Sequence, residues 1–262
     1  MQAENSSSSK IAVTGATGRL GSHLVEILGE RGHGVVPIAR SKGVDVVSGE
    51  GLEEALAGAD TIIDAATGPS PDEEEATKFF TASARNIQRA GAAAGVKRIV
   101  LVSIIGIDKF EGGYNAAKLA QERALLEGPL PVRIVRAAQF HEFPEPLVGW
   151  TIEDGVAHVP EMKTQLVAAR VVAEALADAA EEPEIENGRI TEVAGPRAER
   201  LADAASALFA NRGEEIEIRE GPGGPLARPD DPDAAAYAEG AVLPNPGAKL
   251  AGPTFEEWLT AA

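Results

Sequence analysis

Three glycines in the segment Thr14-Gly-Ala-Thr-Gly-Arg-Leu-Gly21 have the spacing of a phosphate-binding turn. The segment follows a short apolar run and precedes apolar residues that recur at helical spacing. In such a strand–turn–helix unit, Gly15 permits the tight turn, Gly18 lets the backbone approach a pyrophosphate, and Gly21 lets the helix pack on the strand. The helix N-terminus then attracts the anion. We therefore predict a dinucleotide site made by Gly15, Thr17, Gly18, Arg19, Leu20 and Gly21.

A tyrosine and a lysine lie one helical turn apart in Tyr114-Asn-Ala-Ala-Lys118, so they share a face of a predicted helix. A phenol with a pKa near 10 transfers protons poorly at neutral pH. A nearby ammonium favours the phenolate and lowers that pKa. The same spacing occurs by chance on many helices, so an acid–base pair and an unrelated surface spacing are both open at this point.

The residues after the second predicted strand indicate which dinucleotide is bound. A dinucleotide fold selects the adenosine ribose at this place, where a carboxylate favours NAD. The segment Ile38-Ala-Arg-Ser-Lys42 has no carboxylate. Arg40 would clamp a 2′-phosphate with its guanidinium, assisted by Ser41 and Lys42, so NADP is the preferred cofactor and NAD a possible one. Asp45 either contacts the adenine or is a solvated loop residue.

Alternating strands and helices must position these residues. Apolar runs predict strands over residues 10–14, 35–39, 61–65, 98–103 and 132–135, and helical spacing predicts helices over 72–94, 115–126 and 165–180. This alternation predicts an α/β fold: a Rossmann-type doubly wound parallel sheet with right-handed crossovers. The connection that follows Arg40 is too short for a parallel crossover. Either the usual helix is missing and residues 44–47 form a strand stub, which we favour, or the strand is absent. A helix over 51–56 is expected to follow.

The alternation weakens after about residue 140. We expect an irregular segment over residues 141–159, a helix over 198–211, a strand over 215–219, a long loop over 221–253 and a short helix over 255–259. The predicted organisation is a disordered tail (1–9), a Rossmann domain (10–140) and a small C-terminal substrate-binding portion (141–262) interleaved with it. The carboxylate run over 72–75 is expected to cap a helix.

The amino-acid composition narrows the classes of molecule that the protein is expected to bind. The net charge of −17 argues against nucleic-acid binding, because a polyanion would be repelled. The absence of cysteine excludes disulfides and thiolate metal ligands, and four scattered histidines argue against a metal site. No apolar stretch approaches the roughly 18 residues of a membrane span. We expect a cytoplasmic protein with a small-molecule substrate and no membrane or nucleic-acid partner. A homodimer is an open alternative to a monomer.

The Gly-x-x-Gly-x-x-Gly spacing resembles the extended and atypical short-chain dehydrogenase/reductases. The glycine motif resembles their NmrA-like branch in particular, as do Val102-Ser-Ile-Ile-Gly106, Arg136-Ala-Ala-Gln-Phe140 and Val193-Ala-Gly-Pro196. The short connection after Arg40, which has no room for the usual helix, resembles instead that of the sugar-nucleotide reductases. The resemblance covers roughly residues 10 to 200.

This resemblance implies roles for individual residues. The family's tyrosine, here Tyr114, donates a proton to a carbonyl oxygen as hydride arrives, and its lysine, here Lys118, also contacts the nicotinamide ribose. Ser103, eleven residues before Tyr114, would position the substrate oxygen. The resemblance also implies NADP as the cofactor where an arginine stands at position 40.

Ligands of open α/β sheets bind beyond the carboxyl ends of the strands. Further cofactor contacts are therefore expected from Ala65, Ala66, Thr67 and Ala138, and substrate contacts from Phe140, His141 and Phe143. Core packing is the alternative for the aromatic residues, Trp150 included, and a surface position is the alternative for His141. Aromatic walls would suit an apolar or aromatic substrate.

Two classes of function follow from these residues. The first is an NADP-dependent oxidoreductase that acts on a carbonyl or alcohol of a small molecule, with Tyr114 as proton donor. The second is a non-catalytic NADP-sensing regulator; a redox-neutral epimerase or nucleotide-sugar enzyme that retains its cofactor is a third possibility. The intact Tyr114 and Lys118 pair favours an enzyme, and the strong acidity disfavours a regulator that contacts DNA.

Overall fold

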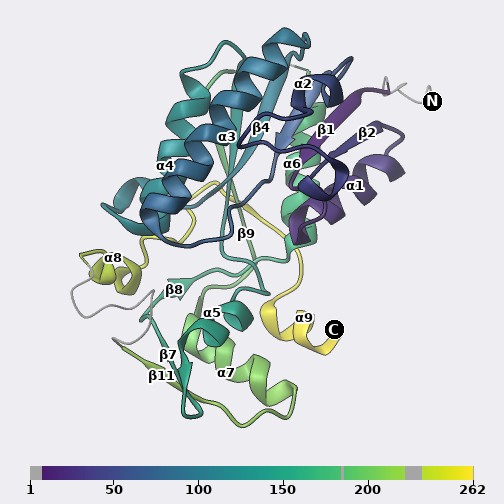
Figure 1. Cartoon of the computed structure of the whole chain (residues 1–262). Helices are drawn as coiled ribbons and strands as arrows, with labels where there is room; N and C mark the ends of the chain where they lie inside the picture. Colours follow the sequence, from purple (N-terminus) through teal and green to yellow (C-terminus); the bar gives the residue numbers. More distant parts are fainter. Residues whose placement is uncertain (1–7, 184–185, 222–231, 262) are drawn as a thin grey trace. The chain divides into compact units, whose positions relative to one another are not determined.

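The computed structural model describes residues 8–183, 186–221 and 232–261 (Figure 1). These residues form two compact units. The first unit holds the described residues as far as Val102, together with Ala120–Val135 and Ala173–Ile190. The second holds Ser103–Leu119, Arg136–Val172 and the described residues from Thr191 onward. Most of the predicted tail, residues 1–7, lies outside the described residues.

The first half of the chain alternates strands and helices. Its elements are β1 (Lys10–Thr14), α1 (Arg19–Glu30), β2 (Gly34–Ile38), the 3₁₀ helix η1 (Arg40–Lys42), α2 (Leu52–Ala55), β3 (Thr61–Asp64), α3 (Glu73–Ala93), β4 (Arg98–Ile104), the 3₁₀ helix η2 (Ile107–Lys109), α4 (Gly113–Leu126) and β5 (Val132–Ala137).

The second half holds shorter elements. They are α5 (Pro144–Thr151), β6 (Ile152–Glu153), β7 (Val156–Val159), β8 (Lys163–Thr164), α6 (Ala169–Glu181), β9 (Ile190–Ala194), β10 (Glu199–Arg200), α7 (Leu201–Asn211), β11 (Glu217–Glu220), α8 (Ala234–Glu239), β12 (Lys249–Leu250) and α9 (Phe255–Ala261).

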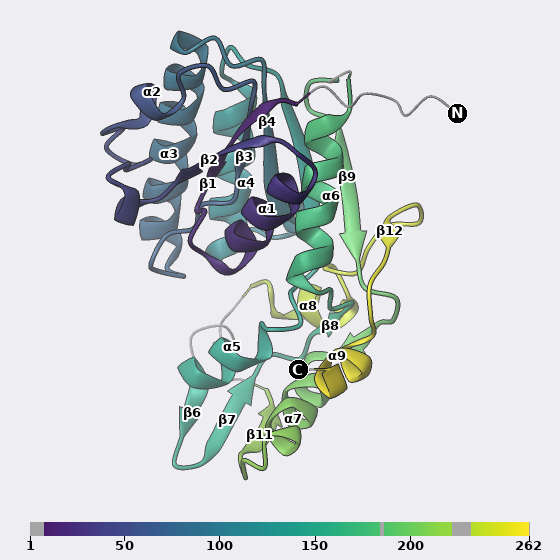
Figure 2. The ribbon, with the colours of Figure 1, turned by 90° about the vertical axis from the view of Figure 1, so that its right-hand side faces the viewer.

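Seven strands form one mostly parallel sheet in the order β12-β9-β5-β4-β3-β1-β2. The pairs β1–β2, β1–β3, β3–β4 and β9–β12 are all parallel. Parallel strands need helical crossovers, which cover both faces of the sheet. In Figure 2, α3 and α4 lie on one face, and α1 and α6 on the other. The Rossmann-type α/β prediction is confirmed.

The apolar residues whose spacing predicted these strands and helices form the core of the first unit. Apolar side chains of α3 and α4 pack with those of the strands in one cluster that includes Ile62, Ile87, Ile99 and Leu125. The N-cap residue of α3 is Asp72, whose carboxylate accepts from the N–H groups of the second and third helical residues. The expected role of the 72–75 carboxylate run as a helix cap is confirmed.

One predicted strand is absent. Residues 44–47 form no strand, and the chain passes from η1 through turns to α2. Asp45 Oδ1 accepts from the N–H groups of Val47 at 2.7 Å and Ser48 at 3.3 Å, which bends the chain. Val44 is buried in the core from this loop. The stub prediction was wrong because valines that pack against a core need not lie on a strand; the short helix that follows is confirmed as α2.

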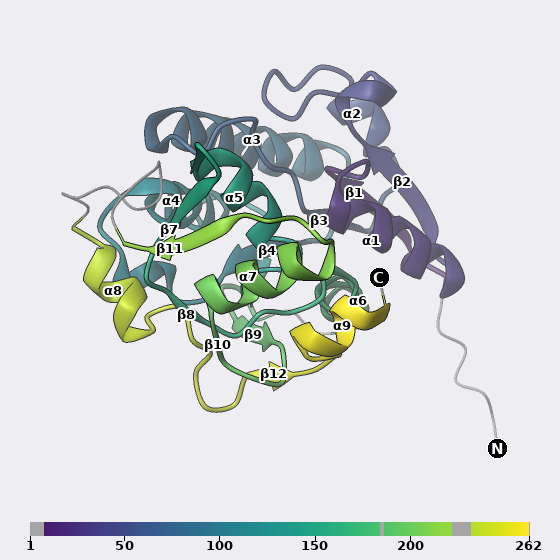
Figure 3. The ribbon, with the colours of Figure 1, turned by 90° about the horizontal axis from the view of Figure 1, so that it is seen from below.

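The second unit packs around its own apolar cluster. Residues of α5, α7 and α9 form it, with Leu147, Leu208 and Phe255 among the buried members. Figure 3 shows α7 beside α5 and α9. The strands β6, β7 and β11 form a small sheet, and β8 pairs with β10 antiparallel.

The sequence predicted too little regular structure in this unit. Residues 141–159, expected to be irregular, contain α5, β6 and β7. The expected loop over 221–253 contains α8 and β12 in its described part, while residues 222–231 lie outside the described residues. No helix in the described part of the chain is long and apolar enough to cross a lipid bilayer.

Candidate functional site

The glycine turn joins β1 to α1 in the first unit. Gly15 has φ +64°, and a Cβ there would lie 2.5 Å from the carbonyl oxygen of Ala65. A Cβ on Gly21 would lie 2.1 Å from the carbonyl oxygen of Gly15. A Cβ on Gly18 would meet only that same oxygen, at 3.2 Å. Packing within the turn therefore requires glycine at 15 and 21, whereas position 18 is open on its outer side, where a ligand would approach.

The N-terminus of α1 is available to an anion. Gly18 is its N-cap residue, no side chain caps it, and its first turn has no acidic residue. Thr17, Gly18 and Arg19 are exposed, and Leu20 and Gly21 are buried. Uncapped N–H groups and the helix dipole favour a phosphate here. The turn therefore fits the pyrophosphate of a dinucleotide.

A buried carboxylate, which the sequence analysis missed, holds the strand ends beside this turn. Asp64 is 1% exposed; its Oδ1 accepts from Thr14 Oγ1 at 2.5 Å and its Oδ2 from Gln121 Nε2 at 2.9 Å. The N–H of Ala65 donates to Thr14 Oγ1 at 3.2 Å. These bonds tie the end of β1 to the end of β3. A carboxylate that closes an otherwise apolar strand is a signal that could have identified Asp64.

The segment after β2 presents cations. Arg40, Ser41 and Lys42 are exposed in η1. In the described part of the chain, the Arg40 guanidinium has no ion-pair or hydrogen-bond partner. Asp45 Oδ1 is occupied by the turn described above. The arrangement suits a negatively charged group at the ribose better than a neutral hydroxyl.

The predicted proton-transfer residues all lie in the second unit. Ser103, near the end of β4, is 3% exposed, and its buried Oγ has no hydrogen-bond partner among the described residues. Tyr114 is half-buried in the first turn of α4. Lys118 follows one turn later and is 5% exposed. The placement of Tyr114 and Lys118 one turn apart on α4 agrees with the spacing argument. The catalytic roles of Ser103, Tyr114 and Lys118 stay predictions.

The residues after the strand ends differ in exposure. After β3, Ala66 is buried and Thr67 exposed. In the second unit, the buried Ala138 donates its N–H to the carbonyl oxygen of Val193 at 3.0 Å. Phe140 is half-buried and forms a single bridge with Val167. The cofactor and substrate roles assigned to these positions stay predictions.

The other aromatic residues of the expected substrate wall lie in different surroundings. Phe143 is half-buried and packs against the core of the second unit, whereas Trp150 is 50% exposed. Packing against the core therefore explains why the Phe143 ring is partly buried. Whether these rings also contact a substrate stays a prediction.

His141 is not a surface residue. It is fully buried, with its ring 5.5 Å from that of Phe255 and 5.4 Å from that of Trp258. Its Nε2 lies 3.2 Å from the carbonyl oxygen of Pro253. Burial lowers the pKa of His141, because a low-dielectric environment disfavours the charged imidazolium. The surface alternative was wrong, because two aromatic residues more than 110 positions later cover the ring.

A comparison with known protein families shows which family the chain belongs to. Residues 15–183 match the family model described as NAD(P)H-binding. The chain belongs to the NAD(P)H-binding family. The prediction of an NAD(P)-binding protein is thereby confirmed. The part that matches this family contains every predicted site residue, from Gly15 to Phe143.

One curated protein is similar in sequence to part of the chain. The 4-hydroxy-tetrahydrodipicolinate reductase of Natronomonas pharaonis is 32% identical over 160 residues, which are 60% of this chain and 54% of that protein. The chain thus spans about half the length of this curated relative.

Solved structures share the fold. MoeE5 in complex with UDP-glucuronic acid and NAD has a TM-score of 0.71 at 18% identity, over 96% of both chains. The NADPH-dependent quinone oxidoreductase QOR2 of Escherichia coli, complexed with NADPH, has a TM-score of 0.68 at 20% identity, over 96% of this chain and 99% of that chain. At these identities the likeness shows the NAD(P)-binding fold and no substrate.

Proposed function

We propose that this member of the NAD(P)H-binding family is an NADP(H)-dependent oxidoreductase. It interconverts a carbonyl and an alcohol on a small molecule with an apolar or aromatic body. The observation that carries the proposal is the buried Ser103 Oγ, unpartnered among the described residues, in the same unit as Tyr114 and Lys118. An unpaired buried hydroxyl costs about 1–3 kcal/mol. A substrate oxygen would supply the missing partner.

In the proposed carbonyl reduction, Ser103, Tyr114 and Lys118 have separate roles. A dinucleotide held by the glycine turn and Lys118 would supply the hydride for the carbonyl carbon. Ser103 donates a hydrogen bond that orients the carbonyl oxygen, and Tyr114 transfers its phenol proton to that oxygen. Lys118 stabilises the resulting phenolate, which makes the proton easier to release. Alcohol oxidation uses the same groups in reverse.

We predict that Arg40→Ala shifts the choice of cofactor. NADP carries a 2′-phosphate, and losing a charge-assisted clamp worth about 1.5–3 kcal/mol should weaken NADP binding by roughly 10- to 100-fold. NAD binding should stay nearly unchanged. Isothermal titration calorimetry with both cofactors measures the ratio. Arg85→Ala is the matched control, because Arg85 is also an exposed arginine of the first unit, on α3. Equal weakening of NADP and NAD would remove the assignment of Arg40 to the 2′-phosphate.

The proposed reaction is tested first by a substrate screen. The purified protein is incubated with NADPH and a panel of small ketones, aldehydes and quinones, and NADPH consumption is followed by its absorbance. Consumption that requires both protein and carbonyl supports an oxidoreductase. Tight NADPH binding without turnover on this panel or on a broad metabolite screen favours the NADP-sensing regulator. Conversion of a substrate without net NADPH consumption favours a redox-neutral enzyme.

A further inference from the structure

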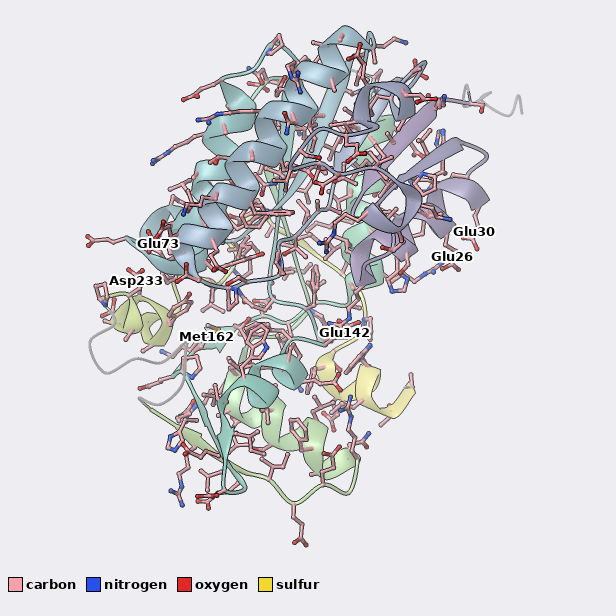
Figure 4. The ribbon with its side chains drawn as sticks, viewed as in Figure 1. Glu26, Glu30, Glu73, Glu142, Met162 and Asp233 are labelled. Atoms are coloured by element: carbon pink, nitrogen blue, oxygen red, sulfur yellow. The ribbon has the colours of Figure 1, made fainter. Side chains whose placement is uncertain are left out.

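The first turn of α4, which carries Tyr114, is held by side chains from α8 and its N-cap residue in the same unit. Asp233, labelled in Figure 4, stands at the start of α8 and is 7% exposed. Its carboxylate accepts from the N–H of Glu111 at 3.0 and 3.2 Å and from the N–H of Gly112 at 3.0 Å. These two N–H groups lie immediately before α4 begins at Gly113.

Asp233 therefore binds the segment that leads into another helix, α4. It occupies the N-cap position of α8, yet its side chain makes no capping hydrogen bond there. An aspartate at this position ordinarily accepts from its own helix. Here both oxygens serve the segment that leads into α4, where a negative charge also interacts favourably with the helix dipole.

Tyr237 makes a second connection to the same turn. Its hydroxyl oxygen accepts from Asn115 Nδ2 at 2.6 Å, and Asn115 is 6% exposed. Its ring lies 4.5 Å from that of Phe110. Asn115 is the residue directly after Tyr114, so the hydroxyl restrains the backbone next to the phenol.

The chain after α8 approaches the β4–α4 connection more closely still. Gly106 has φ +77°, and a Cβ there would lie 2.0 Å from the carbonyl oxygen of Ala241. Lys109 Nζ donates to the same oxygen at 3.0 Å. Residues 106–115 are thus held at three places by residues 233–241.

We propose that Asp233 and Tyr237 are positioning residues that set the location of the Tyr114 phenol for proton transfer. The inference rests on the proposed function, because it requires Tyr114 to be the proton donor. Neither residue touches the reacting atoms in this scheme; both act through the first turn of α4. Proton transfer demands a phenol within hydrogen-bond reach of the substrate oxygen. A displacement of 1 Å in a catalytic group can cost about 100-fold in rate.

The test compares Asp233→Ala with Asp233→Asn in the full-length chain. The alanine variant removes both acceptors and should lower kcat by about 10- to 100-fold. The asparagine variant keeps one acceptor oxygen and should recover part of that loss. The Kd for NADPH should change little, since no cofactor contact is assigned to Asp233 or to the residues Glu111 and Gly112 that it binds. Asp203→Ala is the matched control, because Asp203 is an exposed aspartate in the first turn of α7, and it should leave kcat unchanged.

A double-mutant cycle separates positioning from general loss of structure. If Asp233 acts through the phenol, Asp233→Ala should have almost no effect on the residual turnover of Tyr114→Phe. A purely structural role would lower turnover equally in both backgrounds. Tyr237→Phe, which keeps the ring but removes the acceptor for Asn115, should give a smaller loss with the same non-additivity.

Amide hydrogen exchange supplies a readout that does not depend on turnover. Asp233→Ala should accelerate exchange at Glu111 and Gly112. If exchange accelerates and kcat stays unchanged while Tyr114→Phe is inactive, the positioning role is overturned and the proposed function stands. If exchange does not accelerate, the contact between Asp233 and the segment before α4 is itself overturned. If Tyr114→Phe turns over normally, the proposed function fails, and the positioning role fails with it.

Discussion

Replacement of Tyr114 with phenylalanine is expected to lower turnover by about 10²–10⁴-fold, the range that general acid catalysis contributes. The change removes one hydroxyl and keeps the ring, so the packing of a half-buried side chain at the start of α4 changes little. NADPH binding should persist, because the phenol is assigned to the substrate oxygen. The measurement is kcat with a carbonyl substrate from the screen, alongside calorimetric NADPH binding.

Two further variants sharpen this result. Lys118→Ala should weaken NADPH binding as well as turnover, since the lysine is expected to contact the nicotinamide ribose. Tyr237→Phe removes the hydroxyl of the chain's other tyrosine and should cost less than Tyr114→Phe, because Tyr237 acts only through Asn115. Near-normal turnover in Tyr114→Phe would show that another group donates the proton.

The sequence predicted the sheet better than the contacts around the site. Runs such as Lys10-Ile-Ala-Val-Thr14 and the helical spacing over 73–93 are local patterns, and the structure contains β1 and α3 there. Their periodicity reflects which side chains face the core, so it can be recognised from neighbours a few residues apart. The glycine motif is local in the same sense, because its three glycines lie within one strand–turn–helix segment.

Contacts between distant parts of the chain have no such signal. Asp64 meets Gln121, and Asp233 meets Glu111, across 57 and 122 residues of sequence. Each carboxylate looks like a solvated residue until the fold brings its donors close. The short connection after Arg40 shows the converse error, because two apolar residues that suggested a strand pack on the core from a loop. Local patterns therefore predicted the scaffold, whereas the polar contacts that orient its functional turns required the structure.

Gly18→Ala is expected to abolish most NADPH binding while the protein stays folded. The added Cβ would meet the Gly15 carbonyl oxygen at 3.2 Å, a tight contact that a small shift of the turn relieves. On its outer side the same methyl group would occupy the place assigned to the pyrophosphate. Losing charge-assisted hydrogen bonds worth about 3 kcal/mol weakens binding by roughly 100-fold. Calorimetric titration with NADPH measures this loss, and circular dichroism melting measures the stability.

Two other glycines make the Gly18 result interpretable. Gly29→Ala lies in the same helix with no atom within 4 Å of the new Cβ, so binding and stability should both stay near wild type. Gly21→Ala would place its Cβ 2.1 Å from the Gly15 carbonyl oxygen, so it should lower stability and binding together. A loss of binding without a loss of stability is thus expected at position 18 alone of these three. Wild-type affinity in a folded Gly18→Ala variant would mean that the phosphates bind elsewhere.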